Sequence, residues 1–257
     1  MSKAFCVKLK NRGLLHIEGE DSVDFLQGLI SNDVTKLEEQ RVMYACLLTP
    51  QGKFLHDFFM HHGDGFILID CEGGARAEDL YNRLNRYRLR ADVQLSIEAN
   101  NDVYAVFNHD VGLPDPRHKN LGNRIFEKPD CEERNFDEWD SRRIRLNTPD
   151  GSRDMILERS TMLECNLDKL NAIDWNKGCY MGQELTARMH HRNLGKKHLR
   201  AIEFITDNPP EPLNDLALNN KSLGQMRSSC GNVGLAMIRD DKLEELENDK
   251  SSIRLLG

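Results

Sequence analysis

The sequence predicts an α+β protein of antiparallel strands and a few helices, followed by a small β module. Two apolar stretches, 44–48 and 54–60, flank the turn-forming segment Thr-Pro-Gln-Gly-Lys at 49–53, a pattern typical of a β-hairpin. A strand-like run at 66–69 and an amphipathic helix over 75–87 follow with short connections. Strands and helices in this order favour antiparallel pairing over a doubly wound parallel sheet.

Apolar spacing defines the other elements of the first half. Apolar residues at 25, 26, 29 and 30 predict a short helix over 21–30, which Ser31-Asn32-Asp33 ends. The helix over 75–87 follows the break at Gly73-Gly74, and it carries Leu80, Leu84 and Tyr87 on one face. The runs 93–98 and 103–107 are expected to pair as strands.

The second half is predicted to be less regular. Residues 108–150 hold four prolines and dense charge, so a loop-rich connection with little core is expected. A helical region is expected over 155–192, a linker over 208–212, strands over 223–226 and 233–238, and a solvated acidic helix over 241–250. We expect a first region of residues 1–195, with two interleaved subdomains, and a β module of residues 196–257.

Composition excludes several classes of protein. No apolar run approaches the ~18 residues of a membrane-spanning helix, so no membrane association is expected. The first residues resemble neither a signal peptide nor a transit peptide, which predicts a cytosolic location. The 35 basic and 42 acidic residues give a net charge of −7. Direct nucleic-acid binding is therefore not expected.

The seven cysteines indicate free thiols. The nearest two, Cys165 and Cys179, are 14 residues apart, and no C-x-x-C motif occurs. No self-contained metal site is expected, because such sites carry ligands at short spacing. Cys179 lies in a glycine-rich turn before a helix-forming run and follows Lys177 closely, and both features favour a thiolate. The alternative is a buried cysteine packed in a tight turn.

Residues 177–184 resemble the signature of the YgfZ family, folate-binding relatives of the glycine-cleavage T-protein that act in iron–sulfur protein maturation. The signature residues are Lys177, Gly178, Cys179, Tyr180, Gly182, Gln183 and Glu184. Other blocks of the family are matched in order by 25–28, 32–34, 49–53, 87–93, 163–168 and 224–238. The resemblance implies a T-protein-like fold, with antiparallel sheets and helices around a central hole and a small C-terminal β-barrel.

The resemblance also implies a function. Tetrahydrofolate or a derivative is the expected cofactor, and iron–sulfur client or assembly proteins are the expected partners, with tRNA-modifying enzymes among the candidate clients. Glu164 matches the T-protein glutamate that holds the pterin, whose planar pair of donors suits a carboxylate. Arg188 is the candidate for the folate tail, and Cys179 is the expected essential thiol.

One departure from T-proteins separates the functional alternatives. Two adjacent acidic residues of T-proteins are matched by His56-Asp57, so only Asp57 remains as an acidic folate-site residue. This favours the YgfZ branch over a folate-dependent aminomethyltransferase or demethylase, which needs a group poised at the folate nitrogen. A non-catalytic scaffold is the third alternative. The cations at 188–200 suit a tRNA, a client protein or a polyglutamate tail, although such a run is more often a solvated face and lacks the interleaved aromatic residues that stack bases.

Overall fold

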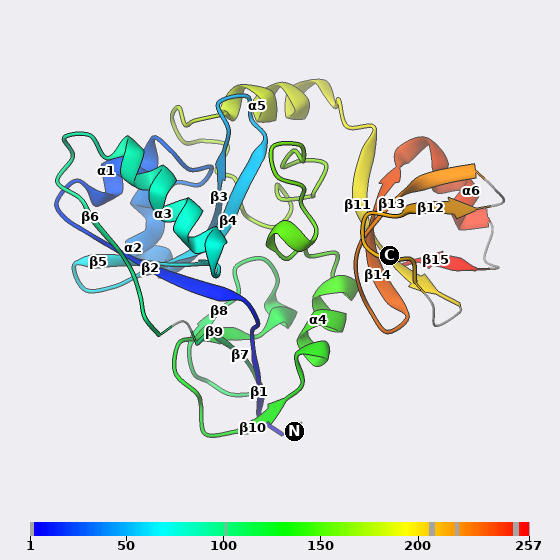
Figure 1. Cartoon of the computed structure of the whole chain (residues 1–257), viewed down its shortest axis with the longest axis horizontal. Coiled ribbons are helices and arrows are strands. Elements are labelled where there is room, and N and C mark those ends of the chain that lie inside the picture. The colour runs from blue at the N-terminus through cyan, green and yellow to red at the C-terminus, as the bar shows by residue number, and fades with distance from the viewer. Residues whose placement is uncertain (1–2, 101, 206–208, 219–220, 249–251, 257) are drawn as a thin grey trace.

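The computed structural model describes residues 3–100, 102–205, 209–218, 221–248 and 252–256, which contain three five-stranded sheets (Figure 1). The first sheet has the order β3-β4-β5-β2-β6 and is antiparallel throughout. Its strands are β2 (Arg12–Glu18), β3 (Val42–Leu48), β4 (Phe54–His62), β5 (Phe66–Glu72) and β6 (Gln94–Ile97). The predicted hairpin is confirmed as β3 and β4.

Three helices cover one face of this sheet: α1 (Ser22–Gln27), α2 (Leu37–Gln40) and α3 (Ala75–Tyr87). A short 3-10 turn, η1 (Val34–Lys36), leads into α2. The predicted bounds of α3 are confirmed, and Leu80 and Leu84 are buried in the same core cluster as Phe58 of β4. Tyr87, at the end of the same face, is 43% exposed, so the buried part of that face ends before the last residue of α3.

The second sheet has the order β10-β1-β7-β9-β8, and β1 and β10 run parallel. Its strands are β1 (Phe5–Lys8), β7 (Tyr104–Phe107), β8 (Leu113–Pro114), β9 (Asn123–Ile125) and β10 (Glu132–Arg134). The expected pairing of 93–98 with 103–107 is wrong, because β6 pairs with β2 and β7 pairs with β1. The chain therefore passes from the first sheet to the second between β6 and β7.

A helix in the predicted loop region joins the second sheet to the C-terminal part. This helix, α4 (Phe136–Arg145), buries Trp139, Arg143 and Ile144, so the expectation of little core over 108–150 is wrong. Asn135 caps α4 by accepting a hydrogen bond from the Asp137 amide. The 3-10 turns η2 (Lys119–Leu121) and η3 (Gly151–Arg153) lie on either side.

The expected helical region over 155–192 is mostly irregular. Its only regular helix in the described structure is α5 (Gln183–Arg192). Glu158, Asn166 and Asn171 have positive φ, a conformation that interrupts a right-handed helix. Residues 155–182 therefore form successive turns beside β3 and β4.

The third sheet forms the C-terminal barrel, with the order β12-β13-β14-β11-β15. Its strands are β11 (Lys197–Phe204), β12 (Asp215–Leu218), β13 (Lys221–Cys230), β14 (Val233–Arg239) and β15 (Ile253–Leu255). The turn η4 (Asp240–Lys242) and helix α6 (Leu243–Asn248) follow β14. Leu246 of α6 is buried, so the expectation of a solvated helix is wrong for this side chain. Residue 208 of the expected linker and residues 249 and 250 of the expected helix lie outside the described residues.

A small charged cavity of about 380 Å³ lies between the first sheet, α4 and the third sheet. Residues from the β1–β2 turn, β5, α4, η3 and β13 line it, among them Lys10, Arg12, Glu72, Asp140 and Ser229.

No described helix is long and apolar enough to cross a membrane.

Candidate functional site

The turn that carries the signature residues is tied to the C-terminal end of α1 by Lys177. Its Nζ donates hydrogen bonds to the carbonyl oxygens of Gln27, Ile30 and Asn32, at 2.9, 2.8 and 2.6 Å. Burial lowers the pKa of this ammonium to about 8, and nearby Asp33 partly opposes the shift. These hydrogen bonds anchor the Lys177 ammonium at the end of α1, and the effect of its charge on the Cys179 thiol stays a prediction.

Two glycines join the signature turn to the β3–β4 hairpin turn. Gly52 and Gly182 both have positive φ, +78° and +82°, which favours glycine. A Cβ on Gly182 would lie 2.4 Å from the Thr49 carbonyl oxygen, and a Cβ on Gly52 would lie 2.7 Å from the Gly182 carbonyl oxygen. The two backbones are in contact, so two separate sequence blocks form one unit.

The signature residues around the cysteine brace this unit. The Tyr180 amide donates to the Gln183 side chain at 3.2 Å, and the Met181 amide donates to the Gly28 carbonyl at 3.0 Å. Burial raises the pKa of the Tyr180 hydroxyl to about 12. Trp175, just before the signature, stacks on His190 of α5, with 4.0 Å between the ring centroids. Glu184, the last signature residue, is exposed on α5.

Cys179 is exposed, whereas the other six cysteines are buried or half-buried. Burial raises the pKa of the Cys6 thiol to about 11 and that of Cys71 and of Cys165 to about 12. Burial also raises the pKa values of Cys46 and Cys230. The alternative of a buried, packed Cys179 is therefore wrong, and Cys179 is the most accessible thiol for chemistry with another molecule.

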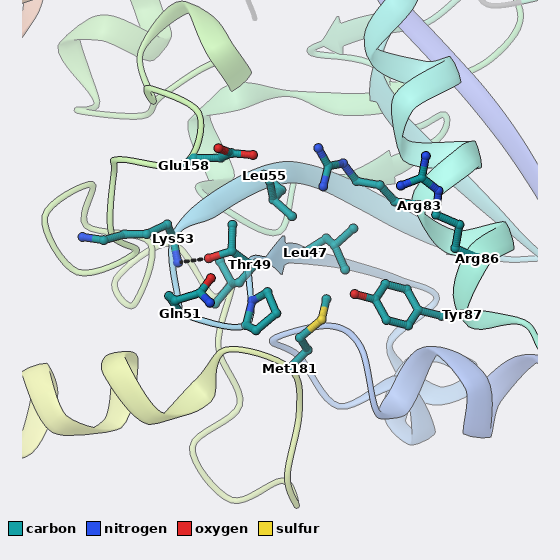
Figure 2. A pocket seen from close by; sticks show the side chains of 12 residues that line it. Leu47, Thr49, Gln51, Lys53, Leu55, Arg83, Arg86, Tyr87, Glu158 and Met181 are labelled. Carbon is teal, nitrogen blue, oxygen red and sulfur yellow. Dashed lines mark hydrogen bonds between the residues drawn. The ribbon is translucent and has the colours of Figure 1, made fainter.

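A cavity of about 590 Å³ opens beside this unit (Figure 2). Leu47 of β3 and Leu55 of β4 lie at its apolar floor, and Thr49 and Gln51 of the hairpin turn line one end. Met181, two residues after Cys179, reaches into it from the signature turn. Three blocks that the sequence singled out, at 49–53, 87–93 and 177–184, thus border one cavity.

The polar side chains of this cavity were not predicted from the sequence. Arg83, Arg86 and Tyr87 line it from the end of α3, and Glu158 lines it from the irregular segment. Figure 2 shows Glu158 and Arg83 above Leu55, approaching from opposite sides. The Glu158 carboxylate has no hydrogen-bond partner among the described residues. No local motif marks Glu158; its positive φ of 57° is visible only in the structure.

The structure does not bring the predicted folate residues together. Glu164 lines a different cavity, of about 680 Å³, beside Lys196 and Asp240, and its carboxylate accepts a hydrogen bond from Thr161 at 2.9 Å. Asp57 is buried and accepts a 2.7 Å hydrogen bond from the Tyr44 hydroxyl. Burial raises the pKa of Asp57. Arg188 is exposed on α5 and does not line the cavity of Figure 2.

His56, which replaces an acidic residue of T-proteins, is paired with a carboxylate of α3. It lies 2.8 Å from Asp79 of α3, and Asp79 accepts a 2.7 Å hydrogen bond from Arg83. Burial lowers the pKa of His56 to about 4, so the imidazole is neutral at physiological pH. Asp79 therefore orients Arg83 at the cavity wall.

Comparisons with known proteins agree with this architecture. Residues 196–255 match the family model of the CAF17 C-terminal β-barrel domain. The structure resembles the crystal structure of glycine cleavage system aminomethyltransferase T from Bartonella henselae, with a TM-score of 0.73 and 12% identity over 99% of this chain and 82% of that chain. The chain therefore has the T-protein fold, and its C-terminal barrel resembles that of CAF17. The predicted fold class is confirmed.

Among curated relatives, 93% of the chain is 29% identical to the "Iron-sulfur cluster assembly factor IBA57 homolog, mitochondrial" of Pyricularia oryzae, of which it covers 72%. It is 28% identical to the human "Iron-sulfur cluster assembly factor IBA57, mitochondrial", of which it covers 78%. These names place the relatives in mitochondria, which contradicts the cytosolic expectation. The character of the first residues, on which that expectation depended, was not a sufficient guide to the compartment.

Proposed function

We propose that this chain is an accessory protein of iron–sulfur cluster assembly that binds a reduced folate and uses Cys179 as its reacting thiol, in the manner of the YgfZ branch. The names of its relatives support the role in cluster assembly. The observation that carries the chemical part is the exposure of Cys179 on a turn that Lys177 and Gly182 hold rigidly.

The cavity of Figure 2 fits a reduced folate. Its volume lies in the range of pockets for small organic ligands. Pro50 and Met181 of the lining offer an apolar surface to the pterin ring, and the free carboxylate of Glu158 matches the planar donor pair of the pterin. The arginines at the other end suit a carboxylate tail. We therefore place the pterin anchor at Glu158, and Glu164 is the rival anchor.

In this proposal the iron–sulfur cluster, or its sulfur, is the cargo on which Cys179 acts. Ligation of iron, acceptance of sulfur and attack on an oxidised group all require the thiolate. Among the described residues, no group of three or more His, Cys, Asp or Glu side chains is arranged to hold a metal ion. Iron bound by Cys179 therefore takes its other ligands from a client or assembly protein, tRNA-modifying enzymes being among the candidate clients.

Calorimetric titration of the purified, reduced chain with tetrahydrofolate tests the folate site. Glu158→Gln is expected to weaken binding by about 1.5–3 kcal/mol, or about 10- to 150-fold, because a charge-assisted hydrogen-bond pair is lost. The matched variant Glu164→Gln is expected to keep wild-type affinity. Loss of binding in Glu164→Gln alone would move the pterin to the other cavity, and no binding in any form would favour the scaffold alternative.

Reactivation of an apo iron–sulfur enzyme tests the role of the thiol. Cys179→Ser is expected to abolish reactivation while folate affinity stays unchanged, because the serine hydroxyl does not supply a thiolate. Cys230→Ser, at a half-buried thiol, is the matched control and is expected to retain activity. Full activity of a well-folded Cys179→Ser variant would refute the proposed role of Cys179.

A further inference from the structure

A cavity of about 790 Å³ lies where one face of α4 meets the second sheet and the barrel. Asn120 of η2 and Arg134 of β10 line it from the side of the second sheet, and Asn232 lines it from the turn between β13 and β14. Figure 1 shows α4 between these two parts of the chain. The wall formed by α4 consists of Glu138, Ser141, Arg142 and Arg145. No described residue lines both this cavity and that of Figure 2.

Two stacked phenylalanine rings position two arginines of this cavity. Phe5 of β1 and Phe107 of β7 are cross-strand neighbours, and their ring centroids lie 4.7 Å apart. The Arg134 guanidinium carbon lies 3.9 Å from the centroid of Phe5, and that of Arg142 lies 4.7 Å from the centroid of Phe107. The negative face of an aromatic ring attracts a cation. Both guanidinium groups therefore have a preferred position before any ligand binds.

The acidic partners of these two arginines are held weakly. Arg142 donates a hydrogen bond to Glu138 at 3.4 Å, and both side chains are half-exposed. Arg134 donates to Glu132 at 3.3 Å, again between half-exposed side chains. The buried Nε of Arg142 has no hydrogen-bond partner among the described residues. Long, exposed ion pairs contribute little free energy, so an anion in the cavity replaces these carboxylates at small cost.

The lining as a whole is cationic. Arg145 adds a third guanidinium, and its acidic neighbour Glu203, 3.5 Å away, is shared with Arg254. Besides Glu138, the one other carboxylate among the described lining residues is Asp137, in the first turn of α4, where the helix dipole favours negative charge. Three arginines and two acidic residues leave a net charge of +1 here, in a chain whose net charge is −7.

The barrel side of the cavity is fixed to α4. The Cys230 thiol, in the lining, donates to the Asp137 carbonyl oxygen at 3.6 Å. Arg143 of α4 donates to the Ser228 hydroxyl of β13 at 2.7 Å. The two walls are therefore held together by side chains outside the arginine pair, and the cavity is formed without a ligand, as ligand sites usually are.

We propose that this cavity binds the phosphate group of a small phosphorylated molecule. A phosphate presents three terminal oxygens in different directions and can accept from several segments at once, whereas one guanidinium satisfies a planar carboxylate. Arg134 and Arg142 supply planar donor pairs, and the side-chain amides of Asn120 and Asn135 add neutral donors. The volume leaves room for the organic part of the ligand. The phosphate site does not depend on the proposed folate site, because tetrahydrofolate carries no phosphate.

The charged cavity of about 380 Å³ is a weaker candidate for an anion. Its Arg12 is paired with the buried Asp70 at 2.6 Å, and its Arg153 is paired with Asp140 and Asp150 at 2.9 and 3.0 Å. Both guanidinium groups are thus already neutralised by close carboxylates. The larger cavity is the better site because its arginines have only long, exposed pairs.

Calorimetric titration of the full chain with inorganic pyrophosphate at low salt tests the site, and citrate is the matched anion of similar charge. Wild-type protein is expected to bind pyrophosphate about tenfold more tightly than citrate, because tetrahedral groups use donors from several segments. Arg142→Gln and Arg134→Gln are each expected to weaken pyrophosphate binding about tenfold or more, since a charge-assisted hydrogen bond is lost. Arg192→Gln, at an exposed arginine in the last turn of α5, is the control and is expected to keep wild-type affinity.

Glu138→Gln gives a result that a merely structural role would not produce. It removes the carboxylate that competes for Arg142, so pyrophosphate affinity is expected to rise about two- to fivefold. Unchanged or weaker binding in this variant would contradict the assigned competition and overturn the site.

Three further outcomes would overturn the proposal. No binding of pyrophosphate by wild-type protein at millimolar concentration refutes the anion site. Equal weakening in Arg142→Gln and Arg192→Gln shows unspecific attraction of anions to cations of the surface. Citrate binding as tight as that of pyrophosphate refutes the phosphate class. Arg142→Gln is expected to keep wild-type affinity for tetrahydrofolate, so each of these failures is distinguishable from a failure of the proposed function.

Discussion

The Cα atom of Gly52 and a Cβ built on Gly182 would lie only 3.1 Å apart, so the β3–β4 hairpin turn and the signature turn meet backbone to backbone. These residues are 130 positions apart in the chain. Their contact explains why glycine occupies both positions: each backbone has a positive φ, and each site lacks room for a side chain. Cys179, on the exposed turn three residues before Gly182, depends on this contact for its place.

Alanine substitutions at the two signature glycines are expected to differ. Gly182→Ala is expected to destabilise the chain by about 2–4 kcal/mol, because a Cβ there is strained at φ +82° and meets the Thr49 carbonyl oxygen. Gly178→Ala is the control, since a Cβ at Gly178 meets nothing within 4 Å; a change within about 0.5 kcal/mol is expected. Chemical denaturation measures both. Equal effects would contradict the proposed backbone contact.

Thiol labelling under native conditions is expected to modify Cys179 first. Its exposure contrasts with the buried Cys46, Cys71 and Cys165, whose pKa values burial raises. Peptide mass spectrometry after a short alkylation should find one main adduct, at Cys179, and adducts at the buried thiols only after unfolding. Early labelling of a buried thiol would show that the described packing is incorrect.

Removing the Lys177 ammonium is expected to loosen the signature turn. Lys177→Met keeps the aliphatic stem but loses three hydrogen bonds to carbonyl oxygens, with an expected cost of about 1.5–3 kcal/mol. Lys36→Met is the control, because Lys36 makes an ion pair with Asp174 nearer the surface, and this exposed pair is expected to contribute less to stability than the three Lys177 hydrogen bonds. Thermal unfolding compares them. A larger loss in Lys36→Met would contradict the assigned role.

A buried arginine couples α4 to the barrel. Arg143 donates hydrogen bonds to Asp140 and Asp154 at 2.6 Å and to Ser228 of β13 at 2.7 Å. Arg143→Met is expected to cost about 3–5 kcal/mol, because the buried Asp154 carboxylate loses its counter-charge, while Asp140 keeps its ion pair with Arg153. Arg142→Met, at the half-exposed neighbour, is expected to cost about 1 kcal/mol or less. Denaturation curves measure the difference, and similar values would refute the coupling role.

Buried histidines are expected to make the chain sensitive to acid. Burial lowers the pKa of His61 to about 4. The unfolded chain, with a histidine pKa near 6.5, then binds more protons between pH 6.5 and 4. Stability therefore falls across that window as pH falls, by up to about 3 kcal/mol for a shift of this size.

Replacement of His61 tests this linkage. In the described residues His61 Nε2 has no hydrogen-bond partner, so His61→Phe removes a buried polar atom and is expected to keep or raise stability at pH 7. The slope of stability against pH should become shallower, although not flat, because the pKa of His56 is also about 4. Denaturation at several pH values measures the slope, and an unchanged slope would contradict the assignment to His61.

Local patterns predicted the elements better than their partners. Apolar spacing correctly predicted α3, the β3–β4 hairpin and the barrel strands β13 and β14, since burial on one face leaves a period in the sequence. The helix α4 was missed because its buried face includes Arg143 and Asp140, whose mutual pairing permits burial but hides the apolar period. The strands β6 and β7 were recognised, but their partners were not.

The sequence by itself determined the segments that matter: the signature turn with Cys179, the hairpin turn with Gly52, and the T-protein-like fold. Only the tertiary structure decided which side chains meet at the cavity. It placed Glu158 and Arg83 there and left Glu164, Asp57 and Arg188 elsewhere. The physical reason is that periodicity and turn chemistry act over a few residues, whereas a site is assembled by packing between segments far apart in the chain, and such contacts leave no local pattern.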